Sequence, residues 1–191
     1  MAAERKDFES NQAMRQVMGD YFVELTKGAE NGKKTAWCTS VGPAELLLSM
    51  GYNVYFPENH GAMLGASRMA TDLIPLANAQ GYSPDICSYL TADIGSYLAK
   101  QSPFHKMKLP GPPKADVLVF NTNQCRDVKD WFQFYAREWD VPCIGIHSPR
   151  ACGDLDFELV GSIAKQIEQL IPTLEEVGGQ KFDIDKLREV I

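Results

Sequence analysis

The sequence predicts an α/β fold: a small doubly wound sheet, Rossmann or flavodoxin-like, with about four parallel strands and flanking helices. Short apolar runs alternate along the chain with longer segments of helical period. Residues 115–121 (ADVLVFN) form a continuous apolar run of the kind that parallel sheets bury on both faces. The segments between the runs are long enough for right-handed helical crossovers, which is how parallel neighbours are joined.

The amino-terminal part of the chain contains the first two predicted strands. Residues 8–27 carry apolar side chains at helical spacing, and glycines follow where this helix should end. Residues 34–38 (KTAWC) and 53–56 (NVYF) are short apolar runs typical of strands. Between them Pro43 fits the first turn of a helix over 43–50.

Two helices are predicted in the middle of the chain, after a glycine-rich stretch. Residues 58–65 are expected to form a loop because of their glycines. A helical pattern resumes over 66–80. A second helix is expected over 83–100, with Ser83 as its cap and Pro84 in its first turn.

The last part of the chain follows a loop over 102–114 that contains four prolines. The chain starts in a helix and stops without a cap, so we expect a piece of a longer protein. We divide it into an N-terminal helix, 1–33, and an α/β domain, 34–191. The elements expected after the proline loop are the strand over 115–121, a helix over 127–139, a strand over 141–146, and helices over 155–174 and 180–191.

Composition excludes several classes of function. The net charge is -6 and the pI is near 5.1, so we expect no nucleic-acid partner. No apolar run approaches the roughly 20 residues of a membrane span, and the polar first residues lack a secretory signal. We therefore expect a cytoplasmic protein. There is no GxGxxG after a strand and no GxxxxGK[ST], which argues against NAD and ATP sites.

Three of the five cysteines are predicted to lie at one edge of the sheet. Cys38 ends the first strand, Cys87 lies in the first turn of a helix, and Cys125 follows the strongest strand. Helix amino termini favour thiolate over thiol, and thiolate is the form that binds metal. Three thiolates at one sheet edge suggest part of an iron–sulfur site. The alternative is that they are small buried apolar residues.

Other reactive residues are weaker candidates. Cys143 lies within a strand, where we expect an inert core residue, whereas Cys152 follows that strand and could reach the same edge. Glu45 could act as a general base or merely complement a helix dipole. His147 ends a strand at the productive edge and is a candidate catalytic residue. His60 is expected in a surface loop, where a histidine usually has no catalytic role.

The motifs around these residues resemble a known family. Residues 37–47 (WCTSVGPAELL) join an aromatic-Cys stretch to a Pro-x-Glu-Leu helix, and 81–89 (GYSPDICSY) are similar to the family's second cysteine motif. Residues 123–127 (NQCRD) match the third less closely, because Arg126 stands where Asp is common. In order and spacing these motifs resemble the amino-terminal domain of a benzoyl-CoA reductase or 2-hydroxyacyl-CoA (2-hydroxyglutaryl-CoA) dehydratase subunit.

The resemblance implies an oxygen-sensitive enzyme of anaerobic metabolism. Its subunits contain two similar α/β domains, with a [4Fe–4S] cluster held between them by cysteines of both. The substrate is an acyl-CoA thioester, a second homologous subunit is present, and a separate ATP-dependent iron–sulfur activator supplies a low-potential electron. The enzyme then either reduces an aromatic ring or removes a 2-hydroxyl group.

Specific residues inherit candidate roles from the resemblance. Cys87 and Cys125 match cluster cysteines, and Cys38 matches a motif cysteine whose ligand role is less certain. Glu45 is similar to a carboxylate near the substrate. Ser40 and Ser88, which lie within the motifs, are candidate cofactor-binding residues.

The resemblance also marks what this chain lacks. The family's remaining cluster cysteine lies in a second domain, so we expect the isolated chain to hold any cluster weakly and to be inactive alone. Two alternatives remain open. One is a non-catalytic electron-transfer or assembly module of the same fold, and the other is a zinc-stabilised domain.

Overall fold

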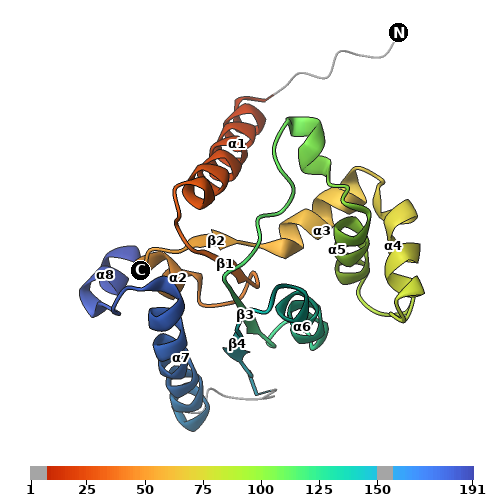
Figure 1. The fold of residues 1–191 in the computed structure, drawn as a ribbon. Helices are drawn as coiled ribbons and strands as arrows, with labels where there is room; N and C mark the ends of the chain where they lie inside the picture. Colours follow the sequence, from red (N-terminus) through yellow and green to blue (C-terminus); the bar gives the residue numbers. More distant parts are fainter. Residues whose placement is uncertain (1–7, 150–156) are drawn as a thin grey trace.

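A parallel sheet lies at the centre of the computed structural model, which describes residues 8–149 and 157–191. Its strand order is β2-β1-β3-β4 (Figure 1). In register, Trp37 lies opposite Tyr55 on one side and Leu118 on the other. The predicted doubly wound α/β sheet is therefore confirmed. The strands are β1 (Thr35–Cys38), β2 (Asn53–Tyr55), β3 (Val117–Asn121) and β4 (Cys143–Ile146).

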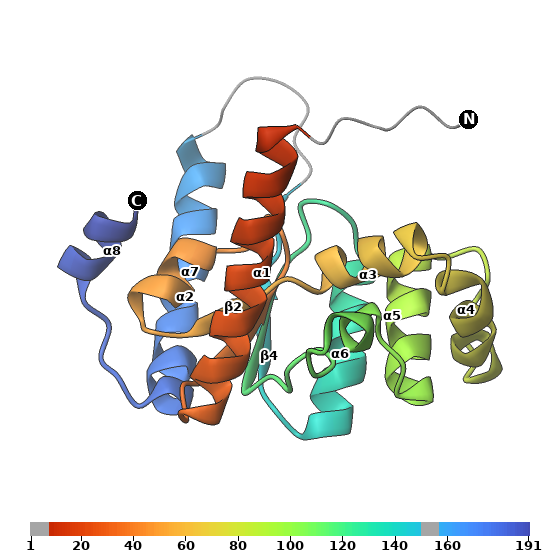
Figure 2. The ribbon, with the colours of Figure 1, turned by 90° about the horizontal axis from the view of Figure 1, so that it is seen from above.

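Helices cover both faces of the sheet (Figure 2). On one side lie α2 (Ala44–Ser49), α7 (Phe157–Gly178) and α8 (Ile184–Val190). On the other side lie α1, α6 and a helical group formed by α3, α4 and α5. The bounds of these helices are Glu9–Glu30 for α1, Asp127–Trp139 for α6, Pro57–Ala66 for α3, Ala70–Ala79 for α4 and Ser88–Ala99 for α5.

The sheet separates two hydrophobic cores. Successive side chains of a strand point to opposite faces. Trp37 therefore packs into an aromatic core with Tyr55 and Tyr135, on the side of α1 and α6. Its neighbour Cys38 packs on the opposite face, in the aliphatic core that includes Leu174 of α7.

One loop prediction was wrong. Residues 58–65 belong to α3, which begins with Pro57 in its first turn. The glycines do not break the helix, because Gly61 serves close packing between helices. A Cβ there would lie 2.9 Å from the Cβ of Tyr89. Gly95 of α5 plays the same part, since a Cβ would lie 2.0 Å from the carbonyl oxygen of Leu73 in α4.

Several predicted helix ends moved. The helix expected from Ser83 begins at Ser88, because the Ser83 hydroxyl accepts the Asp85 N–H in a turn instead of capping a helix. α4 begins only at Ala70, since Arg68 adopts a left-handed φ of 60° that separates α3 from α4. α7 continues past Pro172 to Gly178. The proline loop contains a short 3-10 helix, η1 (Pro103–Met107).

A buried carboxylate, Asp93 of α5, connects three helices. It is 1% exposed. Its Oδ1 accepts a hydrogen bond from His60 Nδ1 of α3 at 2.5 Å, and its Oδ2 accepts from Trp131 Nε1 at 2.9 Å and from the Tyr135 hydroxyl at 2.6 Å, both of α6. Burial and the Asp93 charge raise the pKa of Tyr135 well above its usual range, so this phenol stays protonated and donates.

His60 extends this network to the proline loop. Its Nε2 lies 2.9 Å from Ser102 Oγ, which also accepts the Phe104 N–H and so caps η1. All donors are used if His60 carries its proton on Nδ1 and Ser102 donates to Nε2. The order serine–histidine–aspartate is that of a hydrolase relay, but Ser102 is buried and caps a helix, so we assign the network to the fold. His60, expected in a surface loop, is a core residue.

Removal of this carboxylate should destabilise the whole domain. The substitution Asp93→Ala leaves the donors of His60, Trp131 and Tyr135 buried without an acceptor, at a cost of about 1–3 kcal/mol for each group. We expect the free energy of unfolding, measured by urea titration of Trp fluorescence, to fall by at least about 3 kcal/mol. The exposed Asp85→Ala is the matched control, with an expected change within about 0.5 kcal/mol. Equal losses in both variants would contradict this role.

Candidate functional site at the carboxyl edge of the sheet

The order in which the strands are added to the sheet reverses direction at β1. The chain leaves β1 toward β2 on one side and returns to β3 on the other side of β1. In doubly wound sheets, ligands bind beyond the carboxyl ends of the strands at such a reversal. Hydrogen bonds tie the two strand ends together here, since Asn121 N–H donates to Thr39 Oγ1 at 3.0 Å and Asn121 Nδ2 donates to the Val41 carbonyl at 2.9 Å.

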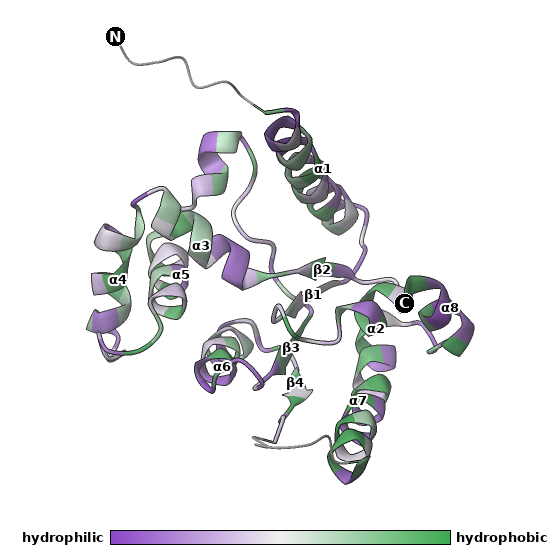
Figure 3. Ribbon diagram, turned by 180° about the vertical axis from the view of Figure 1, so that it is seen from behind, coloured by the Kyte–Doolittle hydropathy of each residue, from purple (hydrophilic) through white to green (hydrophobic). Residues whose placement is uncertain are grey.

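Ser40 and Glu58 form the polar centre of this edge. The backbone N–H and the hydroxyl of Ser40 both donate to Glu58 Oε1, at 3.0 and 3.1 Å, and Gln124 Nε2 donates to Ser40 Oγ at 3.2 Å. Glu58 Oε2 is buried and has no hydrogen-bond partner among residues 8–149 and 157–191. Glu58 lies in the hydrophilic first turn of α3, next to β2 (Figure 3).

Glu58 is the functional candidate that sequence reasoning missed. The sequence feature that could have identified Glu58 is its position just after the second predicted strand, which places it at the same sheet edge as Cys38. Because residues 58–65 were predicted as a loop, no fixed position for its side chain was expected. The helix that actually forms there directs this carboxylate to Ser40.

Cys38 lies at the predicted edge but is buried. It is 0% exposed, and Gly42 covers its sulfur so closely that a Cβ at Gly42 would lie 2.5 Å from Sγ. Burial raises the pKa of the Cys38 thiol well above its usual range, and the carboxylates of Glu58 and Glu45 raise it further. The structure therefore favours a thiol at Cys38, contrary to the thiolate expected from its place before a helix.

Cys87 and Cys125 both adjoin the start of α6. Cys87 is the residue before α5, and its backbone N–H donates to Asp127 Oδ2 at 3.2 Å. Cys125 lies two residues before Asp127 in the chain, and both cysteines are half-buried. One carboxylate thus holds the Cys87 segment against the turn that carries Cys125. Cys38 packs into the core on the opposite face of the sheet from Cys87.

The donor set is incomplete for a four-iron cluster. Within the described part of the chain, no three His, Cys, Asp or Glu side chains are grouped as a metal site. A [4Fe–4S] cluster takes four cysteine ligands. Cys87 and Cys125 would supply two of them, so the described residues alone do not complete such a site.

The remaining predicted residues are spread along the same edge. Glu45 is exposed in the first turn of α2, and Ser88 is exposed as the first residue of α5. His147 is exposed after β4, with its ring packed edge-on against Phe120 at a centroid distance of 5.3 Å. The structure therefore brings Ser40 to Glu58 and the Cys87 segment to the turn of Cys125. Among the described hydrogen bonds, none connects Ser88 or His147 to either of these two pairs.

Of the other two cysteines, Cys143 lies within the described residues and Cys152 does not. Cys143 opens β4 and is half-buried, and burial raises the pKa of its thiol to about 11. It is therefore a neutral thiol at neutral pH. Cys152, a possible further ligand by its sequence position, lies outside the described residues.

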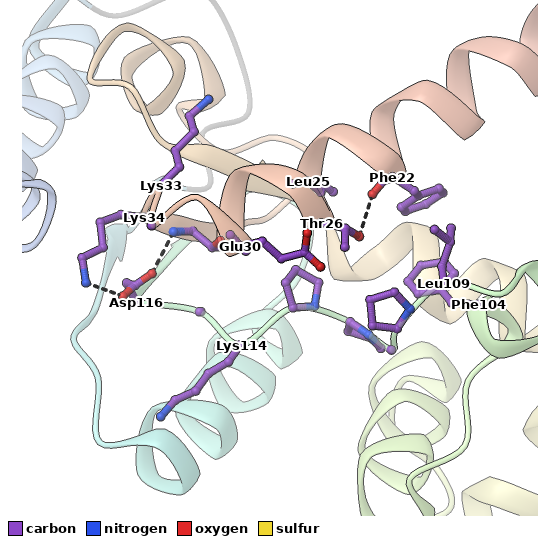
Figure 4. Close-up of a pocket in the computed structure, with 18 of the residues that line it drawn as sticks. Phe22, Leu25, Thr26, Glu30, Lys33, Lys34, Phe104, Leu109, Lys114 and Asp116 are labelled. Atoms are coloured by element: carbon purple, nitrogen blue, oxygen red, sulfur yellow. Dashed lines mark hydrogen bonds and ion pairs between the residues drawn. The ribbon is translucent and has the colours of Figure 1, made fainter.

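Within the described chain, a hollow of about 690 Å³ lies at the opposite edge of the sheet, between α1 and the proline loop (Figure 4). Phe22, Phe104 and Leu109 gather at one end of it, and Lys34 pairs with Asp116 at the other, at 2.8 Å. None of the predicted site residues lines this hollow. Its size therefore does not identify it as the reactive site, and the strand-end chemistry favours the carboxyl edge.

Comparison with known proteins finds a family match over most of the chain. Residues 39–191 match the family described as 2-hydroxyglutaryl-CoA dehydratase, D-component. The chain belongs to this family. The match begins at Thr39, the residue after Cys38, and includes Cys87 and Cys125.

Members and relatives of the dehydratase family align over nearly the whole chain. It is 30% identical over 184 residues to the (R)-2-hydroxyisocaproyl-CoA dehydratase alpha subunit of Clostridioides difficile, covering 96% of this chain and 44% of that subunit. It is 27% identical over 180 residues to one of the benzoyl-CoA reductase subunits of Thauera aromatica, covering 93% and 41%. The chain thus spans about half the length of the curated relatives it matches. Across the described residues, no helix has the length and apolar character needed to cross a membrane.

The burial of Cys38 and the raised pKa values of Cys38 and Cys143 predict how the four described cysteines differ in reactivity. In the native protein at pH 8, we expect Cys87 and Cys125 to react with iodoacetamide well before Cys38 and Cys143, because alkylation requires an accessible thiolate. Mass spectrometry of tryptic peptides over time measures each site. Raising the pH toward 11 should accelerate the alkylation of Cys143, whose pKa is about 11. Fast alkylation of Cys38 in the folded protein would contradict its burial.

Proposed function

We propose that this chain acts in an oxygen-sensitive enzyme of the 2-hydroxyacyl-CoA dehydratase and benzoyl-CoA reductase type. Cys87 and Cys125 would supply two ligands of a [4Fe–4S] cluster, and an acyl-CoA thioester would be the substrate. The observation that carries the proposal is the Asp127 contact, which fixes the Cys87 segment beside the Cys125 turn at the carboxyl edge of the sheet. When bound, such a cluster supplies low-potential electron transfer to the substrate.

The residues around this position have distinct parts in the proposal. Asp127 holds the ligand segment in place. Ser40 is oriented by Glu58 and could donate its hydrogen bonds to a bound group only if that pair opens. Glu45 is exposed beside the buried Cys38 and is free to exchange protons with a substrate at this edge.

Further components belong to the proposal as well. Cys87 and Cys125 would supply only two of four cluster ligands. We propose that a second domain or a homologous partner subunit supplies the additional thiolates. Relatives of this chain are named as alpha subunits, which supports a multi-subunit assembly. A separate ATP-dependent activator would deliver the electron. On this proposal the isolated chain is inactive.

Anaerobic reconstitution tests the cluster ligands. The chain is incubated with iron, sulfide and an excess of a small thiol, which can replace missing thiolate ligands, and then examined by iron and sulfide assay, absorbance and EPR after reduction. We expect Cys87→Ser and Cys125→Ser to lose most of the bound iron. Cys143→Ser is the matched control, expected to retain the wild-type amount.

Two results would count against the proposal. Equal iron in all four proteins would show that these cysteines are not ligands. Stoichiometric zinc in aerobically purified protein, retained in air and lost in Cys87→Ser, would favour a zinc-stabilised domain instead.

A further inference from the structure

A second, smaller hollow opens beyond the ends of β3 and β4. It has a volume of about 390 Å³, within the range of roughly 300–1,000 Å³ typical of small-molecule sites. Two segments of the carboxyl edge and the start of α6 form it. Its lining consists of Thr122, Arg126, Lys129, His147 and Ser148.

Among the described residues, this lining contains hydrogen-bond donors and no carboxylate. Arg126 offers five N–H donors and Lys129 three. Neither forms an ion pair or hydrogen bond with another side chain in the described ranges 8–149 and 157–191. Thr122 Oγ1 accepts the Ser148 N–H at 3.2 Å, which leaves the threonine hydroxyl proton available to a ligand. In a chain of net charge -6, such a concentration of unpaired donors is a local exception.

The acidic residues of the same helix turn away from this hollow. Asp127 accepts the Cys87 N–H, on the side of α6 that faces α5. Asp130 lines a different hollow together with Arg137. Arg126, which precedes α6, and Lys129 of its first turn therefore form no ion pair with Asp127 or Asp130.

We infer that this hollow binds the phosphate groups of a phosphorylated ligand. Guanidinium, ammonium and hydroxyl donors directed into one space are the usual partners of phosphate oxygens. The identity of the ligand rests on the proposed function: it is the CoA part of the thioester. The diphosphate and the 3′-phosphate of CoA carry the negative charge. Arg126 contributes the bidentate donor.

Titration calorimetry of the 191-residue chain with CoA, pantetheine and inorganic phosphate tests this site. We expect CoA to bind, pantetheine to bind at least about tenfold more weakly, and added salt to weaken CoA binding. In Arg126→Gln/Lys129→Gln, we expect the Kd for CoA to rise by about 100-fold, since each lost charged hydrogen bond is worth about tenfold.

The matched control removes the same charge elsewhere. Arg137→Gln/Lys106→Gln changes two exposed cations, one of them on the same helix, and should bind CoA as the wild type does. Thermal unfolding of both double variants checks that they fold. Competition by inorganic phosphate would support the anion site and separate phosphate recognition from recognition of the rest of CoA.

Several outcomes would overturn the inference. These are equal CoA affinity in the two double variants, pantetheine binding as tight as that of CoA, or no binding of either CoA or phosphate. The measurement needs no iron and no reductant. Its failure therefore leaves the cluster reconstitution to decide the proposed function separately.

Discussion

The buried Asp93 carboxylate is the interaction on which the helical half of this molecule depends. A carboxylate with 1% exposure is stable only when its oxygens are fully hydrogen-bonded, and here two other helices, α3 and α6, supply the donors. His60 connects α3 to the carboxylate, and Trp131 and Tyr135 connect α6 to it. Because each donor would be costly to leave unpaired, the carboxylate specifies one arrangement of these helices and not merely a hydrophobic contact.

The candidate site uses the same helix face as this network. Asp127, Trp131 and Tyr135 are spaced by four residues, so they lie along one side of α6. The last two bind Asp93 in the middle of α5, and the first binds the Cys87 N–H at its start. The α5–α6 contact is thus fixed at two points. The hydrogen bonds of Asp93 fix the middle of α5 against α6. The hydrogen bond between Asp127 and the Cys87 N–H fixes the start of α5 and places Cys87 beside the turn of Cys125.

The sheet imposes a different constraint on Cys38. Neighbouring residues of a strand face opposite sides, so with Trp37 in the aromatic core Cys38 must enter the aliphatic one. Its sulfur is covered by Gly42 and lies close enough to Glu58 and Glu45 for their charges to raise its pKa. Three cysteines can therefore share a sheet edge without sharing a site. The edge separates into a cysteine pair near α6, a Ser40–Glu58 pair near β1, and a cationic hollow beyond β3 and β4.

The sequence by itself determined the strands, their order along the chain, most helices, and the edge at which the reactive residues lie, because these follow from local apolar periods and from the rules of parallel sheets. It misread residues 58–65, since the glycines that suggest a loop are needed for contact with Tyr89, a residue distant in the chain. Only the tertiary structure decided which residues meet. Asp93 lies 33 residues from His60 and 38 from Trp131, and no local pattern encodes such pairs. For the same reason the sequence could place Cys38, Cys87 and Cys125 at one edge, but the faces of the sheet decided that only the latter two adjoin the same helix.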